Sequence, residues 1–351
     1  NIYFHAVHHS IPTVTKDELC ASFNDVNPSA SVMALRYAIW AHAAMRCKAY
    51  SHLMASCYKR ARSCLDQVEW ESPGEFATIT TLQAYILVAL FEFKHTVFTR
   101  AWVSVSRATW LARLLDLDKM DAGKPPSPSS NSHAPSALES PAEAARRRRT
   151  FWAVFTLDAL VRVGVGWSPH VGFDYLEIST FLPTDDSWNS ELPADAMTLS
   201  EALALPATGK LTPYQGSIVA VALCHKCLCH VNSAQQDNSL SYGRYDFWCH
   251  HQRLANELQT AKQCPLAHFE SSKFAADSNV LAIQVMLEAS EICVHRAAIS
   301  KEESVGGPTF LTAESDKRCM DAIRNIVAVM HNMRDVAVGK VRSSTISSAI
   351  S

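Results

Sequence analysis

The densest group of potential metal ligands in the sequence lies between residues 224 and 251. Zinc is held by four Cys or His side chains in a tetrahedron, and this segment offers Cys224, His225, Cys227, Cys229, His230, Cys249, His250 and His251. Residues 218–231, however, have the pattern of one continuous helix, which directs neighbouring ligands to different faces. Only Cys224 with Cys227, or Cys227 with His230, would share a face, and the helix that bears His250 would have to supply two more ligands. Cys224, Cys227 and His250 are therefore weak metal candidates, and we favour buried thiols with histidines at the helix edge.

The other polar clusters have simpler interpretations than catalysis. His5, His8 and His9 have no Cys or carboxylate partner at a ligand spacing, so we expect polar residues near a chain end. Asp185 and Asp186 are adjacent, and adjacent side chains usually point apart, which favours a turn or a helix cap. We therefore expect no catalytic residue, no bound cofactor and no enzyme activity in this chain.

A helix with clear start signals follows residue 140. Ser140 and Glu143 have the spacing of a capping box, and Pro141 occupies the first helical position, where a backbone N–H is not needed. Apolar side chains then recur at helical spacing, namely Phe151, Trp152, Val154, Phe155 and Leu157. This pattern predicts a deeply packed helix, and we expect the core to include Trp102, Phe151, Trp152 and Phe155.

The run Arg146–Arg149 at the start of this helix allows three interpretations. It could be a nuclear-import or nucleic-acid patch, a structural element that pairs with carboxylates and lays its alkyl stems on apolar surface, or a solvated helix turn. The structural interpretation is favoured, because the arginines lead directly into the aromatic helix. Cations near a helix start also oppose the helix dipole, so we expect acidic partners.

Several short motifs occur in an order that resembles one protein family. Arg147, Arg148, Arg149, Phe151, Trp152 and Asp158 form the central motif, and the turn Gly166-Trp167-Ser168-Pro169 and the segment Leu182–Asp186 follow it. Similar short matches are Tyr3-Phe4, Pro12, Phe23, Thr81–Ala84, Ala101–Ala108, Leu111–Leu117, His295-Arg296 and Cys319–Ile323. Together they resemble the fungal-specific transcription factor domain, or middle homology region, of fungal zinc-cluster transcription factors.

The resemblance implies an all-α fold of packed antiparallel helical hairpins around a buried aromatic helix. It implies one regulatory domain over residues 1–351, truncated at both ends, in a nuclear protein that binds DNA, often as a dimer, through a separate zinc cluster. The six-cysteine pattern of that cluster does not occur here, so zinc is expected only in a segment outside this chain. A small-molecule inducer or a co-regulator is the implied partner. Two alternatives remain: a partner-binding scaffold that has lost DNA binding, and a Cys/His metal protein.

Composition agrees with a large helical core. Of 351 residues 48% are hydrophobic, and the net charge is −2, so no overall basic field draws the chain to nucleic acid or to an acidic membrane. No apolar run approaches the roughly 20 residues that cross a bilayer. The odd count of 11 cysteines favours reduced thiols.

Hydrophobic periodicity places the helices, and one segment interrupts them. Residues 119–139 are rich in Ser and Pro, which predicts a disordered loop between two core helices. A capping box at Ser72–Glu75 predicts one nearly all-apolar helix through Phe93, and another box at Thr198–Glu201 opens a short helix. The remaining expected helices cover residues 28–47, 49–68, 99–117, 218–231, 245–263, 279–300 and 313–333.

Overall fold

The computed structural model describes residues 2–8, 10–122, 140–165, 173, 177–183, 196–204, 211–236, 247–263, 269, 277–305 and 312–331. These described residues form helices and connecting turns and contain no β-strand, which confirms the expected all-α class. The chain divides into two compact units, Asn1–Ala202 and Leu203–Ser351. No helix in the described ranges is both long enough and apolar enough to cross a membrane.

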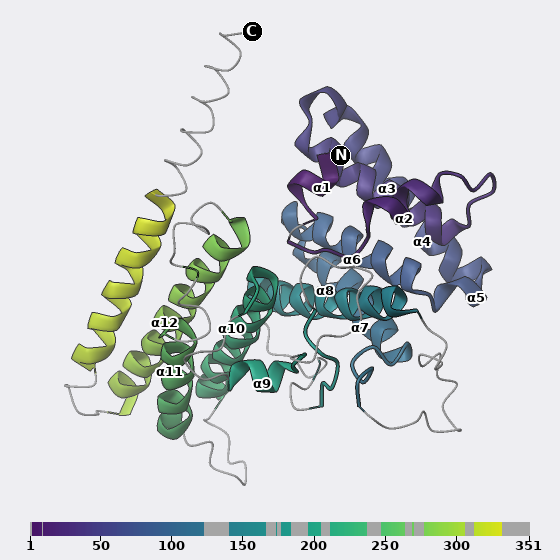
Figure 1. Cartoon of the computed structure of the whole chain (residues 1–351). Coiled ribbons are helices and arrows are strands. Elements are labelled where there is room, and N and C mark those ends of the chain that lie inside the picture. Colours follow the sequence, from purple (N-terminus) through teal and green to yellow (C-terminus); the bar gives the residue numbers. More distant parts are fainter. Residues whose placement is uncertain are drawn as a thin grey trace, which may run out of the picture. The chain divides into compact units, whose positions relative to one another are not determined.

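The first unit is built from short entry helices followed by longer packed ones (Figure 1). Its helices are α1 (Ile2–Ala6), α2 (Lys16–Ser22), α3 (Ala30–Arg46), the 3-10 helix η1 (Lys48–Leu53), α4 (Met54–Glu71), α5 (Pro73–Phe76), α6 (Ile79–Lys94), α7 (Phe98–Leu114), α8 (Pro141–Val165) and α9 (Leu199–Leu203). Helix α3 packs on α4 and α6, and α8 packs on both α6 and α7. The helix α6 therefore lies at the centre of this unit.

The second unit contains three long helices that contact one another, α10 (Pro213–Gln236), α11 (Phe247–Gln263) and α12 (Ser278–Val305) (Figure 1). Lys226 of α10 forms an ion pair of 2.7 Å with Glu257 of α11. A further helix over residues 312–331 contacts α12, where Asn325 donates a hydrogen bond to Glu288 at 3.2 Å. The predicted helices at 218–231, 245–263, 279–300 and 313–333 are thus all present, with shifted ends.

Helix α6 is buried on nearly every side, as its continuous apolar run predicts. The prediction of a single helix from Ser72 to Phe93 is wrong. The chain makes the short helix α5, leaves helical geometry at Ala77, and starts α6 with Thr78, whose side chain accepts a hydrogen bond from the Thr81 N–H. The side chain of Ser72 makes no capping hydrogen bond. Thr78 thus caps the helix that Ser72 was expected to open.

The aromatic face of α8 is fully packed. Phe151 and Trp152 are 0% exposed and Phe155 is 3% exposed, which confirms these three core predictions. The rings of Phe151 and Trp152 meet edge to face at 5.0 Å, and Trp152 meets Phe155 in the same way at 5.2 Å. The indole N–H of Trp152 donates a hydrogen bond of 2.7 Å to the Phe181 carbonyl, so its polar atom is also satisfied.

The core prediction for Trp102 is wrong, because this side chain is 39% exposed. Helix α7 has two apolar faces. The face with the small residues Ala101, Ala108 and Ala112 packs inward, where small side chains let neighbouring helices approach closely. The bulkier Trp102 lies about 100° further round the helix and meets solvent.

Some sequence predictions stay predictions. The turn at 166–169, Asp185 and Asp186 lie outside the described residues, as does 123–139 of the expected loop. The described beginning of that loop, 119–122, is held against the fold, since Asp121 accepts a hydrogen bond from the Phe181 N–H at 2.9 Å. The assignment of 1–351 to one domain also remains a prediction.

Replacing Trp152 with Ala should strongly destabilise the protein. The change leaves a cavity where the buried indole packs, and it removes the hydrogen bond to the Phe181 carbonyl. We expect the free energy of unfolding to fall by about 3–5 kcal/mol. The control is Trp70→Ala, the same change at a side chain that is 82% exposed, where the loss should stay below about 0.5 kcal/mol. Urea denaturation followed by circular dichroism measures both; equal losses would show that α8 is not central to the fold.

Candidate functional site

The arginines at the start of α8 contact acidic and polar groups on three other parts of the first unit. Arg146 forms ion pairs with Glu143 of its own helix, at 3.3 Å, and with Glu18 of α2, at 3.6 Å. It also donates hydrogen bonds to Thr80 and Gln83 of α6, at 3.2 and 3.0 Å. Arg146 therefore connects α2, α6 and α8.

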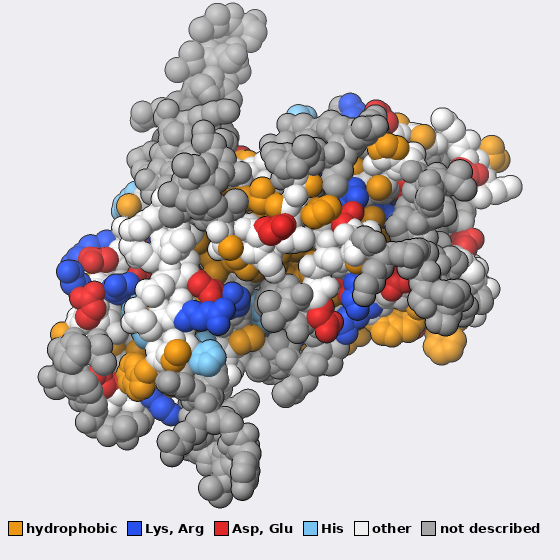
Figure 2. All heavy atoms as spheres, turned by 60° about the horizontal axis from the view of Figure 1, so that its bottom comes forward, with side chains coloured by type: hydrophobic (Ala, Val, Ile, Leu, Met, Phe, Trp, Pro, Cys, Tyr) orange, Lys and Arg blue, Asp and Glu red, His pale blue; other side chains and the backbone are white. Residues whose placement is uncertain are grey.

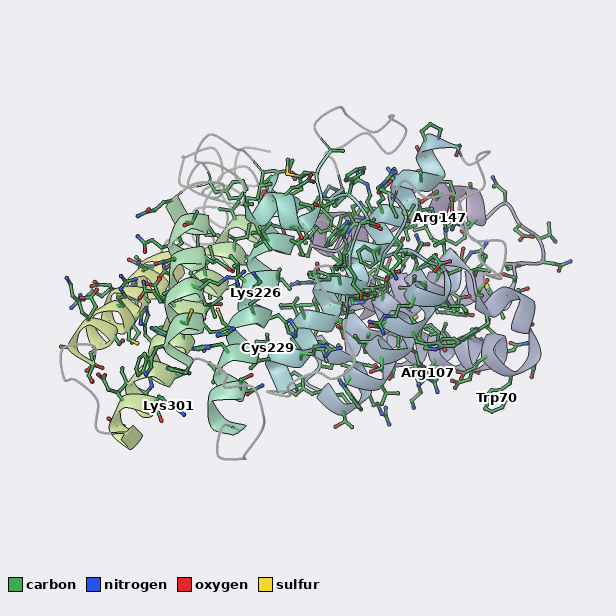
Figure 3. All side chains as sticks on the ribbon, turned by 90° about the horizontal axis from the view of Figure 1, so that it is seen from below. Trp70, Arg107, Arg147, Lys226, Cys229 and Lys301 are labelled. Atoms are coloured by element: carbon green, nitrogen blue, oxygen red, sulfur yellow. The ribbon has the colours of Figure 1, made fainter. Side chains whose placement is uncertain are left out.

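The next arginines make the acidic contacts that the helix dipole calls for. Arg148 binds Asp121 through two hydrogen bonds, Nε to Oδ2 at 2.9 Å and Nη2 to Oδ1 at 2.6 Å. Arg147 pairs with Glu143 at 3.4 Å, and Arg149 is 6% exposed. Figure 3 shows Arg147 among the packed side chains of the first unit. Arg146 to Arg148 thus pair with carboxylates within the fold, as the structural interpretation expects.

Asp158, about two turns before the end of α8, is buried and paired with Arg162 at 2.9 Å. Burial raises the pKa of the Asp158 carboxyl, and the Arg162 guanidinium opposes that rise. The two residues lie four apart on the same helix, so the Asp158 carboxylate is paired within α8. This pairing favours a structural role for Asp158 over a role as a catalytic acid.

Two buried polar residues on α6 were not singled out from the sequence. Gln83 is 0% exposed and donates a hydrogen bond of 2.6 Å to the Thr13 carbonyl. Glu92 is 2% exposed and accepts hydrogen bonds from Tyr58 and Ser104, at 2.6 and 2.7 Å. A lone polar residue within an apolar helix was the available signal, because burial requires a partner for each such group.

An apolar pocket of 580 Å³ lies among α1, α2, α3, η1 and α4. Its lining is mostly aromatic and aliphatic, and several of these side chains are exposed despite their size: Phe23 at 48%, Trp40 at 39%, Tyr50 at 55% and Leu53 at 43%. One cation, Lys16 of α2, is part of the lining. Size and composition are those of a small-molecule site. We call this pocket the N-terminal pocket.

A stack of rings and guanidinium groups fixes one wall of the N-terminal pocket. The ring of Phe23 lies nearly parallel to Trp40, with centroids 6.1 Å apart, and Trp40 meets Tyr37 edge to face at 5.3 Å. Arg36 covers Phe23 at 4.8 Å, and Arg60 covers Tyr37 at 5.7 Å.

The Cys and His residues of the second unit do not form a metal site in the described part of the chain, where no group of three or more His, Cys, Asp or Glu side chains is suitably placed. Cys227 is buried and Cys224 is half-buried on α10. Burial raises the pKa of both thiols, which favours their protonated form when no metal is bound. His250 is exposed on α11, whereas its neighbour His251 is buried.

Instead, three buried histidines come together between α10, α11 and α12. The ring of His251 lies 5.8 Å from that of His230 and 5.2 Å from that of His295. Burial lowers the pKa of His230 and of His295 to about 4, and it also lowers that of His251. The Arg318 guanidinium adds to the effect at His251 and His295. All three are therefore neutral at pH 7.

Comparison with known proteins decides the family. The model of the fungal-specific transcription factor domain matches residues 1–261. The chain belongs to this family. It is a family of transcription-factor regulatory domains and not of enzymes. No solved structure matches the chain.

Curated relatives of this fungal-specific transcription factor domain are fungal activators. The depudecin biosynthesis cluster-specific transcription activator DEP6 of Fusarium langsethiae is 27% identical over 92% of this chain and 51% of its own length. The pigment biosynthesis transcriptional activator pigB of Monascus ruber is 26% identical over 97% and 61%. The citrinin biosynthesis transcriptional activator ctnR of Monascus purpureus is 25% identical over 97% and 58%. The chain thus spans between half and two thirds of these relatives.

Removing Asp121 should destabilise this fungal-specific transcription factor domain. Asp121→Ala leaves Arg148 (15% exposed side chain) without its carboxylate, at an expected cost of about 3 kcal/mol. The control is Asp321→Ala, which breaks a pair of the same 2.6 Å length with Arg324, but with both side chains more than half exposed. That control should cost less than about 1 kcal/mol. Urea denaturation compares them, and a similar cost for both would rule out a structural role for the Arg148 contact.

Acidification should weaken the domain between about pH 6.5 and pH 4. In the unfolded chain a histidine has a pKa of about 6.5. In the folded chain the pKa of His230 and of His295 is about 4. The unfolded state therefore binds more protons in this window, and stability is lost as the pH falls. Melting temperatures at pH 7, 6 and 5 measure the slope. His230→Phe should make it shallower, and the control His52→Phe, at an exposed position, should leave it unchanged; an identical slope in all three proteins would contradict the assignment.

Proposed function

We propose that this chain is the regulatory domain of a transcription activator that controls a biosynthetic gene cluster. The observation that carries the proposal is the family match over residues 1–261, together with relatives named as activators of depudecin, pigment and citrinin biosynthesis. The relatives are longer than this chain. We propose that the intact protein acts in the nucleus and binds DNA through a separate zinc cluster, as a homodimer, with zinc only in that cluster.

The proposed architecture is a stack of antiparallel helical hairpins around α8. Contacts between consecutive helices support it, since α3 packs on α4 and α6 packs on α7. Such a stack contains many interfaces between helices. A ligand that contacts several helices favours the arrangement in which it makes all of its contacts, so it can shift the equilibrium between two packing arrangements.

We place the effector of this regulation in the N-terminal pocket. Helix α2 supplies Lys16, Leu19 and Cys20 to the pocket lining, and the same helix holds Glu18 against Arg146 of α8. A molecule that shifts α2 therefore changes the contact that ties α2 to the central helix. The apolar lining and Lys16 favour an aromatic molecule that carries one acidic group.

Two other functions make different demands. A partner-binding scaffold without DNA binding would lack a six-cysteine segment in the reading frame upstream of residue 1, so the sequence of that reading frame separates it from a DNA-bound regulator. A Cys/His metal protein would carry zinc in the second unit, where Cys224, Cys227 and His250 lie. Metal analysis of the purified chain decides that question.

The regulatory role is tested by placing the chain between a heterologous DNA-binding domain and an activation segment in a reporter strain. We expect reporter output to differ from that of the same fusion without the chain, and Trp152→Ala to abolish the difference by unfolding the domain. Equal output with and without the chain would contradict a regulatory role.

The N-terminal pocket should bind 1-anilinonaphthalene-8-sulfonate, an aromatic anion, at one saturable site. Ala43→Trp fills the pocket from α3 and should abolish this binding. The control Ala55→Trp adds the same side chain at an exposed position of α4 outside the lining and should leave binding intact. Fluorescence titration measures both variants after circular dichroism has verified their folding. Equal binding by both would remove the pocket from the proposal and leave the reporter result unaffected.

A further inference from the structure

The outer face of α7 carries large apolar side chains that are partly exposed to solvent. Trp102 is 39% exposed, Val103 41%, Trp110 57% and Leu114 42%. Val103, Trp110 and Leu114 are seven and four residues apart and so form one stripe along the helix, and Trp102 lies beside it. Exposed tryptophan in such a stripe is unusual on a protein surface and marks a contact site more often than chance.

The stripe forms one wall of a groove of 570 Å³. Glu69 at the end of α4 and Phe76 of α5 form the other wall. The ring centroids of Phe76 and Trp110 lie 6.2 Å apart, with the two rings tilted by 38°. Arg107 spans the groove floor and forms an ion pair of 2.7 Å with Glu69, which neutralises that carboxylate. The lining of this part is therefore apolar and aromatic, with its charges paired.

A second groove, of 520 Å³, continues from the first, because both are lined by Val103. Its lining is polar and includes the cations Lys59, Arg62 and Arg100 and a single carboxylate, Asp66. Lys59 and Arg100 are exposed, whereas Arg62 is held from below by Ser104, to which it donates a hydrogen bond of 3.0 Å. This end therefore presents more positive than negative charge to an incoming molecule.

Figure 2 shows apolar, basic and acidic side chains close together on the surface of the first unit. In Figure 3, Arg107 lies on the helices, and Trp70 extends away from them at the edge of the unit. From Thr99 to Trp110 the two grooves follow twelve residues of α7, or about 16 Å of helix for the eleven rises of 1.5 Å between them. That length suits about three turns of a docked helix.

We propose that this double groove binds an amphipathic helical segment of a partner protein, one with bulky apolar side chains on one face and carboxylates beside them. Its apolar residues contact Trp102, Trp110 and Phe76, and its carboxylates face Lys59 and Arg100. A second copy of this chain fits less well, since a symmetric contact would bring two grooves with excess positive charge together. The inference does not depend on the N-terminal pocket, which has different walls.

The probe is a fluorescein-labelled peptide of about 12 residues with Phe and Leu at helical spacing and Asp or Glu at the remaining positions. Fluorescence anisotropy should show saturable binding that weakens as the salt concentration rises, because exposed charges are screened. A scrambled peptide of the same composition, and one with Lys in place of the acids, should bind at least about tenfold more weakly. Equal binding by either peptide would overturn the proposal.

Variants of the intact chain locate the binding. Trp110→Ala should weaken peptide binding about tenfold or more, and Arg100→Glu several-fold with a smaller salt effect. The matched controls lie in the second unit: Trp248→Ala, whose side chain has the same 39% exposure as Trp102, and Arg253→Glu, whose side chain is 75% exposed. Both should bind as the unaltered chain does.

Two results would overturn the assignment. Trp110→Ala and Trp102→Ala variants that fold normally by circular dichroism and bind the peptide with unaltered affinity would exclude the groove. A dimer in analytical ultracentrifugation that Trp110→Ala dissociates would assign this face to a second copy.

Discussion

The first unit depends on burying the aromatic length of α8 while keeping its basic start paired. Phe151, Trp152 and Phe155 are removed from water, which is the dominant favourable contribution to folding. The same helix carries four consecutive arginines as its sixth to ninth residues, and charges that are largely buried are costly without partners. Glu143, Glu18 and Asp121 supply those partners from α8 itself, from α2 and from the turn after α7. The position of α8 in the first unit is thus fixed both by the packing of its aromatic side chains and by the ion pairs of its arginines.

This arrangement gives a regulatory domain both rigidity and points of control. The packed α6 and α8 resist change because close-packed interiors lose stability when volumes shift. Helix α2 is short, and the ion pair between Glu18 and Arg146 joins it to α8. The proposed ligand of the N-terminal pocket, which α2 lines, would act on α8 through this ion pair.

Helix α7 shows how one helix can serve the fold and a partner at once. Its small residues face α6 and α8, so the helices approach closely without needing large side chains there. Its large residues are partly exposed and lie beside the cations of α4 and α7. In the second unit, by contrast, it is polar side chains that are buried. His230, His251 and His295 are buried and neutral, so they support packing at pH 7 and oppose it in acid.

Much of this protein was determined by local sequence. Helical periodicity, the cap at Ser140 and the apolar run of α6 predicted the class, most helices and the burial of Phe151 and Trp152, because such signals act over a few neighbouring residues. The order of short motifs was specific enough to indicate the family. Tertiary structure alone decided which of two apolar faces of α7 turns inward, whether Ser72 or Thr78 caps α6, and whether His250 or His251 is buried. It also decided that Asp121 meets Arg148 and that α2 meets α8, because such contacts join residues far apart in the chain and depend on how the helices pack.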